Sequence, residues 1–314
     1  MKRISYKTWV LLIVFAASIA SLQAKSTLGG NRNVRKSMRV STQWLAQHIN
    51  DDSLVLLHVG EKSEYVAEHI PGAQFIAISD ISTPRGQGLI LELPPIAQLK
   101  ATFEKLGVTD KSRIVVYFGN DWISPTARVF MTLDYLGLGL RASILDGGLP
   151  VWRREKRAVT PEVKVPKPGH FTPRPNQKLV VDAAWVSGNL NKPGVTIIDA
   201  RDQKFYSGAE AGQMPRAGHI PGARNIPFSS VVEDSDNKFK SASQLRELFN
   251  AAGVKGSDVV ATYCHIGQQA SVLYFAARYL GYDARLYDGS FDEWSRRADL
   301  PVEKSDDANT KVRP

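Results

Sequence analysis

The chain repeats itself, because three segments of its first half return in its second half in the same order. The three pairs are 68–76 with 218–226, 113–139 with 258–283, and 145–152 with 287–294. The clearest pair reads EHIPGAQFI in the first half and GHIPGARNI in the second, at an offset of 150 residues. Solenoid repeats have periods of roughly 20 to 50 residues, so this offset predicts two copies of a whole domain.

The length of 314 residues suits two domains of ordinary size. We place the first domain at 37–158 and the second at 179–304. The segment 159–178 between them is rich in proline, which disfavours both helix and central strand. Its prolines are Pro161, Pro166, Pro168, Pro173 and Pro175. We therefore expect an extended linker across the surface.

Residues 1–24 have the pattern of a secretory signal peptide, in which basic residues precede a short apolar run, here 9–20, and small residues follow. We expect cleavage near Ala24, with Ala20 as a second site, and export to the periplasm. The alternative is an uncleaved anchor, although the run is short for a span of about 20 residues. After cleavage we expect no membrane segment.

The formal net charge of +9 includes three basic side chains of the signal segment, so cleavage would leave +6. These side chains are Lys2, Arg3 and Lys7. A moderately basic protein suits small anionic substrates. The remaining Lys and Arg residues alternate with acidic residues and form no continuous basic stripe, so we do not expect nucleic acid as a partner.

Within the second half, short apolar runs alternate with helical patterns. The runs 195–200 and 258–263 are continuous, as in strands buried inside a parallel sheet, and 241–254 and 270–282 have helical periodicity. The expected C-terminal caps of these helices are Gly253 and Gly281. The pattern predicts α/β domains, each a mostly parallel sheet with helices on both faces.

Cys264 is the only cysteine, so an exported chain of this sequence forms no internal disulfide. The thiol follows a predicted strand and precedes a predicted helix, where α/β sheets bind ligands. With Gly267 allowing an unusual backbone angle, the loop can turn its amides inward and favour a thiolate. We expect the loop to lower the pKa of the thiol to about 7, a shift that requires about 2 kcal/mol of stabilisation of the thiolate. The alternative is a structural, buried cysteine.

A cysteine phosphatase is the nearest rival chemistry. It requires an arginine six residues after the cysteine to hold the phosphate, and that position is Ala270. The histidines and the cysteine show no metal-ligand spacing, so we expect no metal.

Taken together, HIPGA in both halves, IIDARD at 197–202, the cysteine after a strand and YDGSFDEW at 287–294 resemble the tandem-domain rhodaneses. These are the thiosulfate and 3-mercaptopyruvate sulfurtransferases, and the resemblance covers about 37–304. It implies that Cys264 takes a sulfur atom from a small anionic donor, carries it as a persulfide, and passes it to a thiophilic acceptor. It implies no cofactor, and we expect a monomer.

The resemblance also implies which residues bind the donor. The loop residues expected to do so are His265, Ile266, Gly267, Gln268, Gln269, Ala270 and Ser271. A bulky, potentially cationic His265 looks more like the thiosulfate enzymes, so we expect thiosulfate as donor. The alternatives are a 3-mercaptopyruvate enzyme and a non-catalytic protein that carries sulfur or binds anions.

Several positions outside the loop follow from the same resemblance. Relatives often carry a donor-binding arginine where this chain has Phe205, so we expect Lys204 to substitute for it. Asp199 is expected to support the loop by accepting amide hydrogen bonds, and Arg201 to pair with a nearby carboxylate. His69, from the first HIPGA, is expected to reach the cleft.

The first half keeps the pattern of the fold but not the thiol. Aligning the two halves puts Asn120 at the position of Cys264, and HVG at 58–60 where the second half has DAR. Because Asn cannot carry a persulfide, we expect the first domain to be catalytically inactive.

Overall fold

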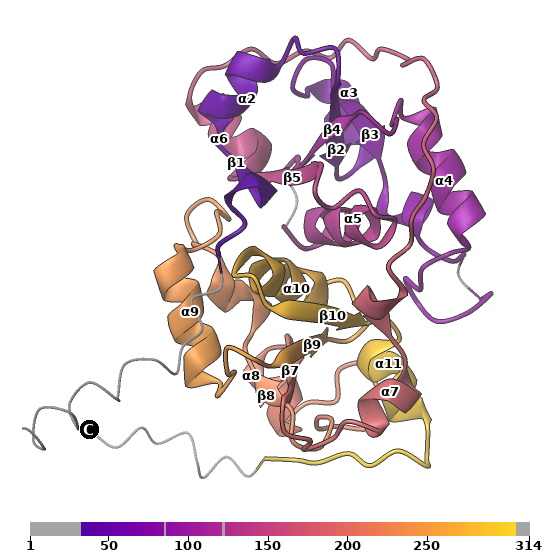
Figure 1. Ribbon diagram of the computed structural model, residues 1–314, viewed down its shortest axis with the longest axis vertical. Coiled ribbons are helices and arrows are strands. Elements are labelled where there is room, and N and C mark those ends of the chain that lie inside the picture. Colours follow the sequence, from indigo (N-terminus) through magenta and orange to yellow (C-terminus); the bar gives the residue numbers. More distant parts are fainter. Residues whose placement is uncertain (1–32, 85, 121–122, 306–314) are drawn as a thin grey trace, which may run out of the picture.

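The computed structural model of the chain describes residues 33–84, 86–120 and 123–305. The predicted signal peptide, 1–24, lies outside the described residues. Figure 1 shows two α/β units, one formed by each half of the chain and stacked one above the other. No helix in the described part of the chain is long and apolar enough to cross a membrane.

The first unit alternates strands with helices. Its elements are η2 (Lys36–Met38), β1 (Arg39–Val40), α2 (Thr42–His48), β2 (Leu54–Val59), α3 (Lys62–Ala67), β3 (Gln74–Ile76), η3 (Ile78–Ile81), α4 (Ile96–Lys105), β4 (Arg113–Phe118), α5 (Ile123–Tyr135), β5 (Ala142–Leu145) and α6 (Gly148–Arg154).

The second unit has the same succession of strands. Its elements are η4 (Gln177–Leu179), β6 (Val180–Val181), α7 (Ala183–Ser187), β7 (Val195–Asp199), α8 (Gln203–Ser207), β8 (Arg224–Asn225), η5 (Phe228–Val231), α9 (Ala242–Ala251), β9 (Val259–Tyr263), α10 (Ala270–Tyr279), β10 (Asp283–Tyr287) and α11 (Ser290–Arg296). The strands predicted at 195–200 and 258–263 are confirmed to within one residue. The two predicted helices form and are followed by Gly253 and Gly281, both with left-handed backbone angles.

Each unit contains a five-stranded sheet in which every strand pair is parallel. The strand orders are β1-β5-β4-β2-β3 and β6-β10-β9-β7-β8, which are the same order in the two halves. The predicted fold class and the domain duplication are therefore confirmed. All-parallel sheets require helices on both faces, because both faces are apolar.

Apolar side chains from opposite faces of each strand enter different cores. In β4, Val116 packs in the core that holds α4 and α5, whereas Val115 packs with α2, α3 and α6. In the second unit, Val260 of β9 lies with α9 and α10, and its neighbour Ala261 faces α7 and α11. This alternation places helices on both faces of each sheet.

The two units share one core. Helices α5 and α10 lie against each other between the two sheets (Figure 1), and Phe130 meets Phe275 edge to face with ring centroids 4.8 Å apart. Helices α5 and α10 follow the equivalent strands β4 and β9, and Ser124 at the start of α5 meets Gln268 in the loop before α10.

The segment 161–176 between the units contains no helix or strand, but it is fastened to the first unit. The backbone N–H of Gly169 donates to the Glu104 carbonyl at 2.7 Å, and Phe171 is completely buried. This segment therefore forms a strap along α4.

The strand register fixes which residues of the two units correspond. His58 of β2 pairs with Phe75 of β3, and Asp199 of β7 pairs with Asn225 of β8. Phe75 and Asn225 stand at the same place after the two HIPGA motifs. His58 therefore occupies the position of Asp199.

In the next strand, Tyr117 and Tyr263 are equivalent. They pair with His58 and Asp199, and each hydroxyl accepts a hydrogen bond, 3.1 Å long in both units, from the isoleucine N–H of HIPGA. The next residues, Phe118 and Cys264, are consequently equivalent. The prediction that Asn120 stands at this position is wrong by two residues along the strand, because alignment on the helices hides a difference in loop length.

Candidate active site

Cys264 lies directly after β9, in a short loop that closes around its sulfur. The backbone N–H groups of Ile266, Gly267 and Ala270 lie close enough to the sulfur to favour its ionised form, and we call these three groups the sulfur cradle. Gly267 has φ +83°, a left-handed angle that glycine adopts without strain and that lets the loop turn inward. The predicted inward-facing amides are therefore present, and they can stabilise negative charge on sulfur.

The thiol itself is buried, with 1% of Cys264 exposed. Burial raises the pKa of Cys264 above its usual range, the cradle N–H groups oppose this shift, and the nearby Asp199 carboxylate adds to it. We expected a lowered pKa, and the direction is wrong. Removing water from a thiolate costs more than three amide donors return, so the thiol is protonated at pH 7.

The segment after β10 holds the backbone of the loop. The Cys264 N–H donates to Ser290 Oγ at 3.3 Å, and Phe291 N–H donates to the Cys264 carbonyl at 2.9 Å. Asp292 N–H donates to the His265 carbonyl at 2.8 Å. Ser290 has φ +51°, a left-handed angle that is uncommon for a residue with a side chain and is found at functional sites. The YDGSFDEW motif thus serves as the support of the cysteine.

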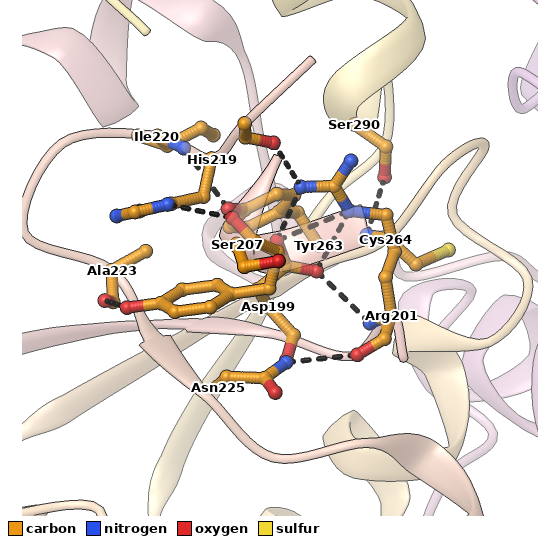
Figure 2. A network of polar contacts seen from close by, with 12 residues as sticks. Asp199, Arg201, Ser207, His219, Ile220, Ala223, Asn225, Tyr263, Cys264 and Ser290 are labelled. Carbon is orange, nitrogen blue, oxygen red and sulfur yellow. Dashed lines mark hydrogen bonds and ion pairs between the residues drawn. The ribbon is translucent and has the colours of Figure 1, made fainter. Parts of the chain in front are cut away.

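A buried ion pair lies beside Cys264, at the end of β7. The Asp199 carboxylate accepts hydrogen bonds from the Arg201 backbone N–H at 2.9 Å and from its guanidinium, at 2.6 Å from Nη2. Figure 2 shows this pair next to Cys264 and Tyr263. Both side chains are at most 1% exposed, and the guanidinium also stacks on Phe291, with the ring centroid 4.0 Å away.

The expectation that Asp199 supports the sulfur loop through amide hydrogen bonds is not met. Asp199 does not accept hydrogen bonds from amides of the sulfur loop, because both its oxygens are directed to Arg201. Its support of the loop is therefore indirect: it holds a buried cation beside the sulfur, and that cation lies close enough to interact electrostatically with Cys264.

His265 and Phe205 form the aromatic side of the site. The two rings meet edge to face with centroids 4.7 Å apart. Burial and the positive charge of Arg201 lower the pKa of His265, so its ring is neutral at pH 7. Lys204 is half exposed, pairs with Glu210 at 3.1 Å and lies over the Phe205 ring. It does not line the cavity beside the thiol.

A cavity of about 190 Å³ opens beside the thiol. Its lining residues are Ser124, Cys264, His265, Ile266, Gln268 and Gln269. Ser124 belongs to α5 of the first unit, and its hydroxyl accepts a hydrogen bond from Gln268 Nε2 at 3.3 Å. Ser124 could not be found from the sequence, since no motif marks it. Among the described residues no lysine or arginine lines this cavity.

Two residues expected at the donor site are placed elsewhere. Both ring nitrogens of His69 face backbone carbonyls, Nδ1 that of Tyr65 at 2.7 Å and Nε2 that of Glu162 at 3.1 Å, and the ring stacks on Tyr65. His69 is therefore not brought to the cavity. The Ser271 N–H donates to the Gln268 carbonyl and its hydroxyl to the Gly267 carbonyl, so Ser271 stabilises the loop without facing the sulfur.

No group of three or more His, Cys, Asp or Glu side chains that could bind a metal ion occurs within residues 33–84, 86–120 and 123–305.

Comparison with known proteins gives the same family for both halves. The profile of the rhodanese-like domain matches residues 41–155 and 182–297. The chain is 32% identical to the 3-mercaptopyruvate sulfurtransferase of Escherichia coli K12, over 84% of this chain and 97% of that protein. It is also 32% identical to the sulfur carrier protein TtuD of Thermus thermophilus, over 85% and 97%.

A third relative is named for thiosulfate and not for 3-mercaptopyruvate. The protein named "Putative thiosulfate sulfurtransferase SseB" of Mycobacterium tuberculosis is 34% identical, over 76% of this chain and 84% of that protein. Among solved structures, the anaerobic ergothioneine biosynthesis enzyme of Chlorobium limicola superposes with a TM-score of 0.76 at 20% identity, over 86% of this chain and 71% of that one. At that identity the likeness concerns the fold alone. Both halves of the chain thus belong to the rhodanese-like domain family, and the relatives of the chain include proteins named as sulfurtransferases.

Proposed function

We propose that the protein is a sulfurtransferase in which Cys264 carries the transferred sulfur as a persulfide. One observation supports this most strongly: the chain's single thiol lies on three inward-facing amides. A persulfide anion needs hydrogen-bond donors, and it needs no general base. The first unit contributes to the cavity wall through Ser124 but has no thiol of its own.

The reaction has two halves. With thiosulfate as donor, the Cys264 thiol loses its proton to solvent and the thiolate attacks the outer sulfur. The sulfur–sulfur bond of thiosulfate breaks, sulfite leaves with the electron pair, and a Cys264 persulfide remains. A thiophilic acceptor such as cyanide then attacks the terminal sulfur, leaves as thiocyanate, and regenerates the thiolate. The cradle stabilises the anion at each stage.

The raised pKa of Cys264 gives this scheme a pH dependence. Because the thiol of the free protein is mostly protonated at pH 7, the second-order rate of donor attack should keep rising as the pH increases beyond 9, the ordinary value. A rate of persulfide formation that is flat between pH 7 and 9 would contradict a raised thiol pKa.

Thiosulfate is the donor that we propose first, in keeping with the small cavity and the amide-rich loop. A second candidate, 3-mercaptopyruvate, is supported by a specific observation. The His265 ring is neutral, and no cationic side chain of the described residues lines the cavity. A dianion such as thiosulfate would therefore find few binding groups there other than backbone amides. A donor with one carboxylate and a polarised thiol would meet the same cavity at a lower desolvation cost.

Two measurements test the proposal. Intact-mass analysis after incubation with thiosulfate should show the gain of one sulfur atom on Cys264, removed again by cyanide. No gain with either donor would reject sulfurtransferase activity, and a gain that no small acceptor removes would favour a carrier of the TtuD kind. The ratio of kcat/KM for thiosulfate and 3-mercaptopyruvate then ranks the donors.

We further propose that the protein acts after export, as a monomer. N-terminal sequencing of the protein from a periplasmic extract should begin near Lys25 if the signal segment is cleaved near Ala24. Recovery in the membrane fraction with an intact N-terminus would favour the anchor instead.

A further inference from the structure

Arg128, in α5 of the first unit, is a buried cation for which the mechanism above has no use. Its side chain is completely buried. The Nη2 atom donates to Asp288 Oδ1 at 2.5 Å and to the Leu91 carbonyl at 2.6 Å. The Nε and Nη1 atoms are buried as well, and neither has a hydrogen-bond partner within the described ranges. A buried guanidinium with unused donors is costly, which points to a role beyond packing.

Nη1, one of the two unpartnered nitrogens of Arg128, lies against Gly267 of the sulfur cradle. A Cβ atom added to Gly267 would lie 3.1 Å from Arg128 Nη1 and 3.1 Å from the Asp288 carbonyl oxygen. Gly267 therefore packs directly on the Arg128–Asp288 pair. Since the N–H of Gly267 is one of the three donors to the sulfur, the pair determines where that donor lies.

Asp288 connects the same pair to the cysteine backbone. It opens the segment in which Ser290 and Phe291 bind the backbone of Cys264. Its second oxygen, Oδ2, accepts the N–H of Leu93 at 2.9 Å, a residue of the first unit. Residues of the first unit therefore bind both carboxylate oxygens of Asp288.

The molecule contains a matched contact that lacks the thiol. Asp146 is the counterpart of Asp288 in the third repeated segment. It pairs with Arg39 at 2.5 Å and accepts the N–H of Phe239, from the other unit, at 3.0 Å. Neither Arg39 nor Asp146 lines the cavity beside Cys264. The molecule thus offers, as a control, an Arg–Asp pair that lies within the first unit and binds the backbone of the second unit at Phe239 and Lys240.

We propose that Arg128 is a positioning residue for sulfur transfer: by binding Asp288 and packing on Gly267, the first unit holds the cradle N–H groups on the sulfur. The proposal rests on the proposed function for its kinetic consequence, but not for its effect on the thiol. The charged groups that face Cys264 directly are Asp199 and Arg201, and His265 lies in the same loop. None of these three is altered by a change at Arg128.

The test compares Arg128→Met with Arg39→Met in the full chain. Because the protein has one cysteine, alkylation by iodoacetamide reports Cys264 alone, and its rate against pH gives the apparent pKa of the thiol. In Arg128→Met we expect the midpoint of this profile to rise by about one pH unit and kcat to fall about tenfold, with KM changed less than about twofold. In Arg39→Met we expect the wild-type profile and kcat, whatever the loss in thermal stability.

Each outcome decides the matter. A folded Arg128→Met protein with the wild-type alkylation profile, or an Arg39→Met protein shifted as much as Arg128→Met, would overturn the proposal. Should Arg128→Met fail to fold, Asp288→Asn serves instead, because the amide keeps an acceptor for the Leu93 N–H and loses the charge that holds Arg128. The same upward shift of the alkylation midpoint is expected in this variant. An unchanged midpoint rejects the proposal. If the wild-type protein transfers no sulfur, the proposed function fails, while the alkylation comparison still decides the role of Arg128.

Discussion

The two units of this molecule share one backbone plan and differ at the ends of two equivalent strands. At the end of β7 the second unit has the buried pair of Asp199 and Arg201, whereas the first unit has His58 and Gly60 there. His58 is completely buried, with Nδ1 bound to the Tyr117 hydroxyl at 3.1 Å and Nε2 without a partner in the described structure. A buried ion pair thus replaces a buried neutral ring, without any change in sheet order.

A second difference lies directly above the sulfur position. Ser290 and its counterpart Gly148 have nearly the same backbone angle, φ +51° and +54°. In the first unit glycine adopts this angle freely, and the Phe118 ring fills the space: a Cβ on Gly148 would lie 2.8 Å from it. In the second unit the serine accepts the strain and supplies the hydroxyl that binds Cys264. The comparison teaches that the fold tolerates either arrangement, and that the two units differ at these strand ends in a few side chains.

The largest effect should follow from removing the thiol. Cys264→Ser is expected to lower the rate of thiocyanate formation at least ~1,000-fold, because the hydroxyl cannot form a persulfide, with Tm changed by only a few degrees. The companion variant adds Phe118→Cys to this protein, which places a thiol at the equivalent strand end of the first unit. We expect no recovery of activity, and recovery of more than about 1% would show that the first unit can also cradle sulfur.

The next effect tests the buried ion pair. Asp199→Ala leaves Arg201 buried and unpaired, and we expect a loss of about 3–5 kcal/mol in the free energy of unfolding, measured with urea. Replacing both residues, by Asp199→Leu with Arg201→Met, should cost less than the single change. If the free energy of unfolding of Asp199→Ala falls by less than about 1 kcal/mol, the ion pair does not stabilise the second unit in the way proposed here.

His58 predicts an acid sensitivity that belongs to the first unit. Burial, with a smaller contribution from His69, lowers the pKa of His58 to about 4, against about 6.5 in the unfolded chain. The resulting stabilisation is complete above pH 6.5 and is lost as the pH falls towards 4, amounting to about 3 kcal/mol. His58→Gln should therefore show a shallower fall of Tm between pH 7 and 4.5 than the wild type; His219 and His265 titrate in both proteins, and parallel curves would contradict the prediction.

The smallest effect on stability is expected at Ser290. Ser290→Gly relieves a left-handed angle worth about 1 kcal/mol and removes a hydrogen bond worth about the same, so the free energy of unfolding should change by under about 1 kcal/mol. Turnover should nevertheless fall about fivefold, since Cys264 loses the partner of its N–H. The reverse change, Gly148→Ser, should destabilise the protein by about 1–3 kcal/mol, because its side chain meets Phe118. Equal turnover in wild type and Ser290→Gly would show that Ser290 does not contribute to the reaction.

Much of the fold could be predicted from sequence because it depends on local pattern. The continuous runs that became β7 and β9 are apolar on both faces, and Gly253 and Gly281 follow helices in the conformation that favours glycine. The position of Cys264 followed from the order strand, loop, helix. Each of these signals lies within a few neighbouring residues.

The rest depends on residues brought together by folding. The direction of the Cys264 pKa shift is set by burial, which a strand-and-loop argument underestimates. Ser124 and Arg128 reach the active loop only because α5 packs against α10, and no spacing in the sequence marks either one. The HIPGA motif suggested that His69 reaches the cleft, but His69 and His219 both lie against backbone carbonyls of their own units, those of Tyr65 and Tyr206.

The strap at 161–176 has a consequence for how the cavity wall is supplied. A separate protein offering Ser124 or Arg128 to the loop would lose translational and rotational freedom at each encounter and would dissociate on dilution. Here Phe171 and Gly169 attach the segment between the units to α4. The first unit is therefore present at an effective concentration that does not depend on the amount of protein. The first unit thus behaves as a permanently bound subunit of the second, and the site should stay complete at the lowest concentration at which activity can be assayed.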